Sequence, residues 1–174
     1  TKGMRILRKQ VPEQILLDGG HFERSPLYHS LAFEDVLDLL NIVKCFTSKL
    51  NESDQHFFES LKERAKEMKK WLLAMCHPDK EISFFNDSAF GIATVSNALF
   101  SYADRLGINN TDLNNRKITN FSESGYLRLN YHIATALIDV ATIGPDYLPG
   151  HAHADTLSFE LSIRNQRVLV NSGT

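Results

Sequence analysis

The spacing of hydrophobic positions changes character near residue 107 of this chain. From about residue 25 to residue 106, apolar residues recur at intervals of three and four, as on one face of a helix. After an asparagine-rich, turn-like stretch at 107–120, apolar and polar residues alternate, as in half-buried strands. Helices followed by strands predict an α+β architecture rather than a doubly wound sheet. We expect a helical domain over residues 1–112 and an antiparallel β domain over residues 113–174.

Three helices are predicted between residues 25 and 106. The first begins at Ser25-Pro26, because serine is a preferred N-cap and proline suits the first helical position. Its apolar residues lie on most sides, which favours packing between other helices. The second begins after the N-cap Asn51, and the third spans about 92–106 and ends before Gly107. On the second helix we expect a solvated charged face, formed by Lys62, Glu63, Lys66, Glu67, Lys69 and Lys70.

Five strands are predicted after the asparagine-rich stretch, at 117–121, 126–131, 134–142, 156–163 and 168–171, with a tight connection at 164–166. Five strands make at most half of a β-sandwich. Three helices would also leave the two-sided apolar helix partly exposed. These two features predict that the chain is a fragment of a larger architecture, completed by the rest of a parent chain or by a homo-oligomer.

Composition narrows the classes of partner. The chain is 43% hydrophobic and 23% charged, with a formal net charge of −2 at pH 7, so it has no overall attraction for nucleic acid or anionic lipid. An anionic substrate would need a local basic site. No apolar run is long enough to predict a membrane span. The two cysteines, Cys45 and Cys76, lie in apolar helical contexts and are expected to be buried thiols.

The densest group of chemically capable side chains follows Gly150. His151, His153 and Asp155 stand at a spacing of two. On a strand this spacing would place all three on one face, within reach of a common ligand or metal ion. The alternative is that they are polar residues at the edge of a strand.

A second group occupies residues 18–29, a loop that runs into the first predicted helix. Asp18-Gly19-Gly20 is typical of a turn. Tyr28 falls at the third helical position after the Ser25 cap, where the helix dipole favours an anion by about 0.3–1 kcal/mol. The phenol there is either a proton-transfer group or a core aromatic. The other candidates in this loop are His21, Glu23, Arg24 and His29.

A third group, Phe84-Phe85-Asn86-Asp87-Ser88, separates the second and third helices. Asn86 and Asp87 are suited either to capping the next helix or to hydrogen bonding with sugar hydroxyls. Phe84 and Phe85 are suited either to the core or to stacking against a pyranose ring.

In combination, order and spacing, four segments resemble the heparinase II/III family of bacterial polysaccharide lyases. They are residues 18–29, residues 85–88, residues 150–159 and residues 168–174, and the resemblance extends from about residue 11 to the end. It implies the last helices of an incomplete α/α toroid followed by the first strands of an antiparallel β-sandwich domain. It also implies an anionic polysaccharide as substrate, with His21, Glu23, Arg24, His29, Asn86 and Asp87 in the groove.

The resemblance further implies cleavage of a uronic acid-containing chain by β-elimination. Tyr28 matches the family's general acid, which can also serve as base, and His151 matches the second proton-transfer residue. His153 matches a ligand of a structural divalent metal, often zinc. Asn171 stands where the family has a metal-binding Asp, and a neutral amide is a poorer zinc ligand. The family's carboxylate-neutralising Asn would precede residue 1, so we expect the isolated chain to be inactive.

Two alternatives remain open at this point. A non-catalytic saccharide-binding or assembly module of a surface-polysaccharide system would keep the groove without catalysis. A metal-dependent hydrolase is the other, because His-x-His near a strand also occurs in barrel amidohydrolases. The sequence does not specify which polysaccharide is used among heparan-type chains, alginate and capsular uronans. Family members are commonly periplasmic or exported, which is an implication of the resemblance.

Overall fold

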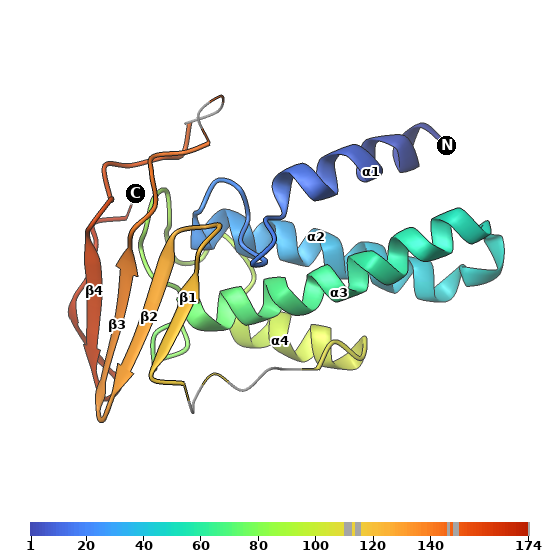
Figure 1. Ribbon diagram of the computed structural model, residues 1–174. Coiled ribbons are helices and arrows are strands. Elements are labelled where there is room, and N and C mark those ends of the chain that lie inside the picture. Colours follow the sequence, from blue (N-terminus) through green and yellow to red (C-terminus); the bar gives the residue numbers. More distant parts are fainter. Residues whose placement is uncertain (110–112, 114–115, 146, 148–149, 174) are drawn as a thin grey trace.

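The computed structural model describes residues 1–109, 113, 116–145, 147 and 150–173 (Figure 1). In these residues, helices precede a single antiparallel sheet, as the hydrophobic spacing predicted. The helices are α1 Lys2–Gln14, α2 Pro26–Cys45, α3 Glu52–Met75 and α4 Ser96–Arg105, with a short 3-10 helix η1 Thr47–Lys49 between α2 and α3. None of the helices in this part of the chain combines the length and hydropathy needed to cross a membrane.

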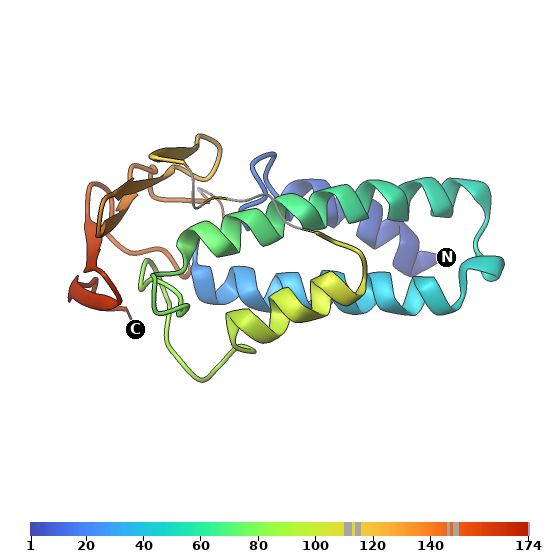
Figure 2. The same cartoon turned by 90° about the horizontal axis from the view of Figure 1, so that it is seen from below.

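Helices α2 and α3 run side by side along the long axis of the molecule, with α1 and α4 flanking them (Figures 1 and 2). Both predicted starts are confirmed by side-chain caps. Ser25 Oγ accepts a hydrogen bond from Tyr28 N at 3.3 Å, and Asn51 Oδ1 accepts one from Asp54 N at 2.8 Å. The apolar stripe of α3 packs against α2 and α4 in a core formed by Phe33, Leu37, Leu61, Ala65, Met68, Leu72, Leu99 and Ala103.

The sheet stands at one end of the helical layer (Figure 2). Its strands are β1 Ile118–Phe121, β2 Tyr126–Tyr131, β3 Ala134–Asp139, β4 Phe159–Ile163 and β5 Gln166–Leu169, which pair antiparallel in sequence order. A second core cluster joins the sheet to the end of α3. It contains Trp71, Ala74, Met75, Phe85, Leu113, Phe121, Tyr126 and Leu137.

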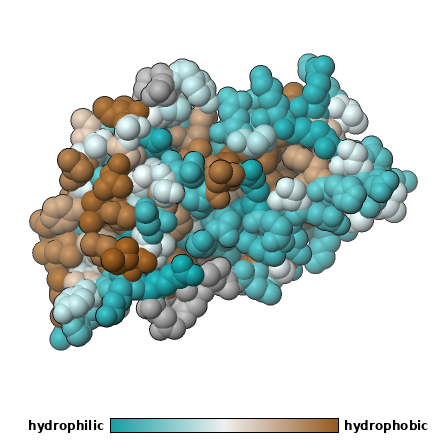
Figure 3. Space-filling model, in the orientation of Figure 1, coloured by the Kyte–Doolittle hydropathy of each residue, from teal (hydrophilic) through white to brown (hydrophobic). Residues whose placement is uncertain are grey.

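The two faces of the sheet differ in an unexpected way. The face toward the helices carries mostly polar side chains, among them Arg128, Thr135, Asp139, Glu160, Ser162 and Arg167, and Glu160 and Ser162 are fully buried. The outer face carries apolar residues in register across the strands, including Leu129, Ala136, Leu161 and Leu169. In the space-filling view, hydrophobic residues gather over the sheet end, whereas the helical end is mainly hydrophilic (Figure 3).

Several predicted boundaries were wrong. Helix α1 was not predicted as a separate element, and α4 begins at Ser96 rather than at residue 92. Strand β3 ends at Asp139, and β5 begins at Gln166 rather than at residue 168. Strand β4 begins at Phe159 rather than at residue 156, because Leu157 has a left-handed φ of 69° and Ser158 N closes a turn onto the Asp155 carbonyl at 2.7 Å.

The predicted solvent exposure of two side chains was also wrong. Lys69 was assigned to the solvated face of α3, but it is 1% exposed and donates to Asp104 Oδ1 at 2.7 Å and to the Ile108 carbonyl at 3.0 Å. Cys45 was expected to be buried, but it lies exposed at the end of α2; Cys76 is buried as expected.

Candidate functional site

Tyr28 and His151 lie against each other, although they come from opposite ends of the chain. Their ring centroids are 4.0 Å apart and their planes are inclined by 32°. Tyr28 is in the first turn of α2, whose start is fixed by the Ser25 cap. Both rings are partly exposed, so each is accessible to a ligand. The structure thus brings together the two residues predicted to transfer protons.

The segment that carries His151 is not the strand predicted from the spacing. Residues 150–155 form turns and irregular structure between β3 and β4. His151, His153 and Asp155 therefore do not share a strand face. Their convergence depends instead on the turn at residues 84–88, with which each of them makes a hydrogen bond.

Asp87 is the carboxylate that joins the two histidines. Its Oδ2 lies 2.9 Å from His151 Nδ1 and its Oδ1 lies 2.7 Å from His153 Nε2. Its own backbone N–H donates to the His151 carbonyl at 3.1 Å. Sequence reasoning placed Asp87 in a substrate groove or at a helix cap. The geometry instead makes it an orienting group for two imidazoles, with Nε2 of His151 left on the opposite side of the ring.

Asn86 ties the same turn to its surroundings. Its backbone N–H donates to Asp155 Oδ2 at 2.6 Å, and its side-chain Oδ1 accepts from His153 N at 3.0 Å. Its Nδ2 donates to the Arg24 carbonyl at 3.1 Å and lies 3.2 Å from the Tyr126 hydroxyl. Asn86 is only 6% exposed and has a left-handed φ of 55°. These bonds occupy the amide that was predicted to contact sugar, so Asn86 holds the turn in shape.

His21 and Glu23 border the pair formed by Tyr28 and His151. His21 Nδ1 is 4.0 Å from Glu23 Oε2 and has no hydrogen-bond partner among the described residues. Burial, and secondly the nearby His151, lower the pKa of His21 to about 4, so its imidazole is neutral at pH 7. Burial raises the pKa of Glu23, and His151 acts in the opposite direction. Both groups therefore feel the charge on His151.

His29 and Arg24, both predicted to contact substrate, make hydrogen bonds within the protein. His29 is fully buried; its Nδ1 accepts from His21 N at 3.2 Å and its Nε2 faces the Met68 carbonyl at 3.0 Å. With both ring nitrogens bonded to backbone inside the core, it has no group left for a ligand. Arg24 Nη1 donates to the Thr142 carbonyl, which joins the 18–25 loop to the chain after β3.

The two predicted metal ligands, His153 and Asn171, are each hydrogen-bonded to other residues. His153 Nε2 bonds to Asp87, whereas Asn171 Nδ2 donates to Ser158 Oγ at 3.2 Å and Asn171 N donates to Glu160 Oε1, also at 3.2 Å. Within the described residues, no group of three or more His, Cys, Asp or Glu side chains has a geometry suited to a metal ion. Zinc binding by His153 and Asn171 therefore stays a prediction; Asn171 Oδ1, the atom that would bind the ion, accepts from Ser172 N at 2.9 Å.

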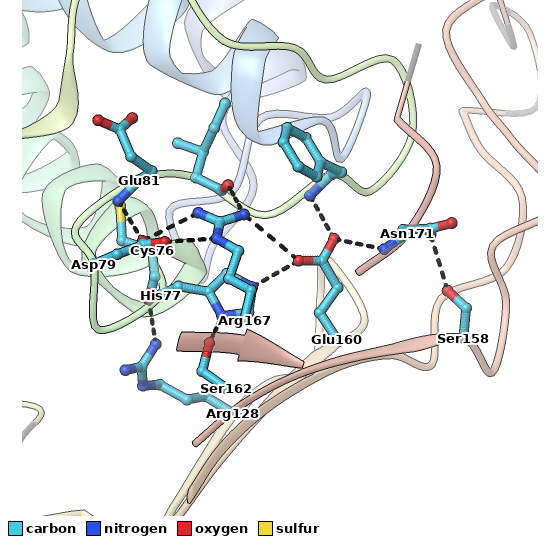
Figure 4. A network of polar contacts seen from close by, with 12 residues as sticks. Cys76, His77, Asp79, Glu81, Arg128, Ser158, Glu160, Ser162, Arg167 and Asn171 are labelled. Carbon is cyan, nitrogen blue, oxygen red and sulfur yellow. Dashed lines mark hydrogen bonds and ion pairs between the residues drawn. The ribbon is translucent and has the colours of Figure 1, made fainter. Parts of the chain in front are cut away.

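A buried polar network next to this site was missed by sequence reasoning. Glu160 on β4 lies at its centre, with His77, Arg167 and the backbone of Phe84 and Asn171 around it (Figure 4). A single glutamate in a strand normally indicates a solvent-facing position. One feature of the sequence could have indicated the network: Glu160 and Ser162 lie on the same face of β4, and Arg167 lies opposite Ser162 on β5 after the tight turn.

Comparison with known proteins shows which family this chain is similar to. Residues 1–111 match the family model described as heparinase II/III N-terminus, and residues 114–174 match the model described as heparinase II/III-like, C-terminal. Among curated proteins, none is similar enough in sequence to count as a match.

Solved structures agree in fold. A heparan sulfate lyase HepC mutant from Pedobacter heparinus superposes with a TM-score of 0.78 at 21% sequence identity, over 99% of this chain and 28% of that one. A heparinase III gene product gives a TM-score of 0.77 at 19% identity, over 99% of this chain and 28% of that one. Another heparinase III gives 0.75 at 20% identity, over 98% and 30%. The chain thus spans less than a third of the length of these proteins.

Proposed function

Because the chain belongs to the heparinase II/III family, we propose that Tyr28 and His151 are the proton-transfer residues of a polysaccharide lyase site. The observation that carries this proposal is the 4.0 Å contact between the two rings, with His151 bonded to Asp87. Two proton-transfer groups on adjoining segments, both partly exposed, are what an elimination reaction needs.

The proposed reaction is β-elimination at a uronic acid. A base removes the proton at C5, the C–H electron pair forms the C4–C5 double bond, and the bond from C4 to the glycosidic oxygen breaks. An acid then protonates that oxygen as it leaves. The C5 proton becomes acidic enough only when the charge on the neighbouring carboxylate is neutralised.

His151 is suited to removing or receiving a proton. With its Nδ1–H donated to Asp87 Oδ2, the Nε2 lone pair is free to accept a proton, and the Asp87 carboxylate stabilises the imidazolium that forms. Tyr28 is suited to protonating the leaving oxygen, because its phenol is partly exposed and lies against the His151 ring. Its proton is then restored from solvent.

No metal-dependent step is part of this mechanism. A cation at His153 would compete with the bond from His153 Nε2 to Asp87 Oδ1. If a divalent metal binds the whole protein, its role on this chain's residues would be to fix the 150–155 segment that carries His151.

The proposed substrate class is a uronic acid-containing polysaccharide. One structural relative is named a heparan sulfate lyase, so heparan sulfate is the first substrate to test and alginate is the comparison. The chain covers only 28% of that relative, and we propose that full activity belongs to the longer protein rather than to these 174 residues alone.

The test is an elimination assay on the full-length parent protein, followed by the ultraviolet absorbance of the unsaturated uronate. We expect Tyr28→Phe and His151→Ala each to lower kcat by about 10²-fold or more, the usual contribution of a general acid or base. Tyr131→Phe and His56→Ala are matched controls, because both side chains are exposed at sites remote in the fold, the β2–β3 turn and α3. Undiminished elimination in both site variants would refute the assignment. Saccharide binding without elimination in the wild type would favour the binding-module alternative.

A further inference from the structure

Glu160 is a fully buried carboxylate that the proposed mechanism does not use. It lies on the polar face of β4 and is 0% exposed. Its Oε2 is 2.6 Å from His77 Nε2 and 3.9 Å from Arg167 Nη1. Burying a carboxylate carries a large desolvation cost unless hydrogen bonds or ion pairs satisfy its oxygens. The partners of Glu160 therefore indicate which parts of the chain it holds in place.

The other oxygen of Glu160 binds two backbone segments. Oε1 accepts from Phe84 N at 2.6 Å and from Asn171 N at 3.2 Å (Figure 4). Phe84 begins the turn that contains Asn86 and Asp87. The two segments also approach each other farther along, where a Cβ built on Gly173 would lie 2.6 Å from the Ser88 carbonyl oxygen. Glu160 thus sets where the 84–88 turn sits on the sheet.

Neighbouring groups hold Glu160 itself in place. His77 Nδ1 is 2.7 Å from Ser162 Oγ, which fixes the imidazole on β4. Arg167 donates to Asp79 Oδ2 at 2.7 Å and to the Ile82 carbonyl at 2.9 Å. The segment 77–84 is therefore attached to β4 and β5 along its length. The bond from Phe84 N to Glu160 holds the start of the turn, and the bonds of Asn86 to Asp155 and Arg24 hold its middle.

From this chain of contacts we propose that Glu160 is a positioning residue for His151. It fixes the turn at Phe84, the turn fixes the Asp87 carboxylate, and Asp87 orients the imidazoles of His151 and His153. The inference rests on the proposed function only for its effect on catalysis. The geometric part, that loss of Glu160 loosens the two histidines, holds whether or not the protein is a lyase.

The experiment compares three variants of the full-length protein. Glu160→Ala removes both acceptors. Glu160→Gln keeps a carbonyl oxygen for Phe84 N and Asn171 N, and its amide can donate to His77 Nε2. Leu61→Ala is the control for a purely structural loss, since Leu61 is 1% exposed in the helical core on α3. All three are compared at a temperature where circular dichroism shows each to be folded.

The first readout is the rate at which diethylpyrocarbonate modifies each histidine, mapped by mass spectrometry. We expect Glu160→Ala to raise the rates at His151 and His153 at least threefold, because their bonds to Asp87 open more often. Glu160→Gln and Leu61→Ala should leave these rates near wild type, and the exposed His56 serves as the internal standard. Equal rates at His151 and His153 in Glu160→Ala and Leu61→Ala would overturn the proposal.

The second readout is the steady-state elimination rate of the same proteins. We expect Glu160→Ala to lower kcat at least tenfold with little change in KM, and Glu160→Gln to recover most of the loss. A kcat for Glu160→Ala equal to that of Leu61→Ala would reject the effect on catalysis. Absence of elimination in the wild type, together with faster histidine modification in Glu160→Ala, would reject the lyase function and leave the positioning role standing.

Discussion

The histidines of this chain show how one residue type takes different roles in different surroundings. His29 is enclosed between α2 and α3 with its ring 4.4 Å from that of Trp71, and burial lowers its pKa to about 3. His21, beside the candidate site, has a pKa lowered to about 4 for the same main reason. His151 remains partly exposed and paired with Asp87. The sequence predicted proton transfer for His151 and substrate contact for His21 and His29, and it could not indicate which of them is buried, because burial depends on the tertiary fold.

The two buried histidines predict a loss of stability in acid. Their pKa values in the folded state lie below the ordinary value of 6.5, so folding is favoured fully above pH 6.5 and less as pH falls toward 4 and then 3. Each pKa unit corresponds to about 1.4 kcal/mol, so the two residues together amount to several kcal/mol. Asp139 acts in the opposite direction, because burial raises its pKa to about 6. We expect the urea concentration at the midpoint of unfolding to be lower at pH 5 than at pH 7.

The contribution of His29 can be isolated by substitution. Glutamine can accept from His21 N and donate to the Met68 carbonyl but does not take up a proton, so His29→Gln should reduce the difference in urea midpoint between pH 7 and pH 5. His56→Gln is the matched control, since the His56 side chain is 71% exposed. An unchanged pH difference in His29→Gln would show that protonation of His29 does not drive the loss.

At the scale of elements, the two helix starts marked by a side-chain cap were predicted well and strand ends poorly. A cap such as Ser25 or Asn51 acts within one turn, so the local sequence contains the information. The start of β4 depends on a left-handed residue, Leu157, at which leucine gives no signal. Helix α1 was missed although Met4, Leu7 and Val11 form an apolar stripe against the helical core; it contains Pro12, a residue that usually ends or kinks a helix.

The loop before α2 provides a prediction about element packing. Gly19 has a φ of 90°, and a Cβ there would overlap the backbone of α3 at Glu67 and would lie 2.7 Å from Met68 N. We expect Gly19→Ala to lower the free energy of unfolding by about 3 kcal/mol, from left-handed strain of about 1 kcal/mol and overpacking of about 1–3 kcal/mol. The loop would then move away from α3, and His21 with it. Urea denaturation measures the loss.

Gly91 offers a close control for this substitution. Its φ is 78°, and nothing lies within 4 Å of a Cβ built there. Gly91→Ala should therefore cost only the left-handed strain, about 1 kcal/mol. Equal losses for the two variants would mean that contact of the loop with α3 contributes nothing to stability.

At the scale of the whole molecule, strand β4 buries its polar side chains and turns its apolar side chains outward. Phe159, Leu161 and Ile163 are the apolar residues of this strand, yet Glu160 and Ser162 are the ones that point toward the helical layer and are buried. Alternation predicts two faces but does not say which one packs against the rest of the chain. For the same reason the sequence could identify Tyr28 and His151 as candidates, while the role of Asp87 and Glu160 required knowledge of where the 84–88 turn meets the sheet.

The apolar outer face of the sheet predicts how this chain behaves alone in solution. Ile118 is 64% exposed and Phe159 is 49% exposed, on strands whose remaining outward residues are also mostly apolar. A contiguous exposed apolar surface of this kind promotes association. We expect concentration-dependent self-association in analytical ultracentrifugation, reduced by the double substitution Ile118→Lys and Phe159→Lys. The single substitution Ile6→Lys, at a residue 49% exposed on α1, should leave association unchanged. A wild-type chain that stays monomeric at high concentration would contradict the assignment of this face as an association surface.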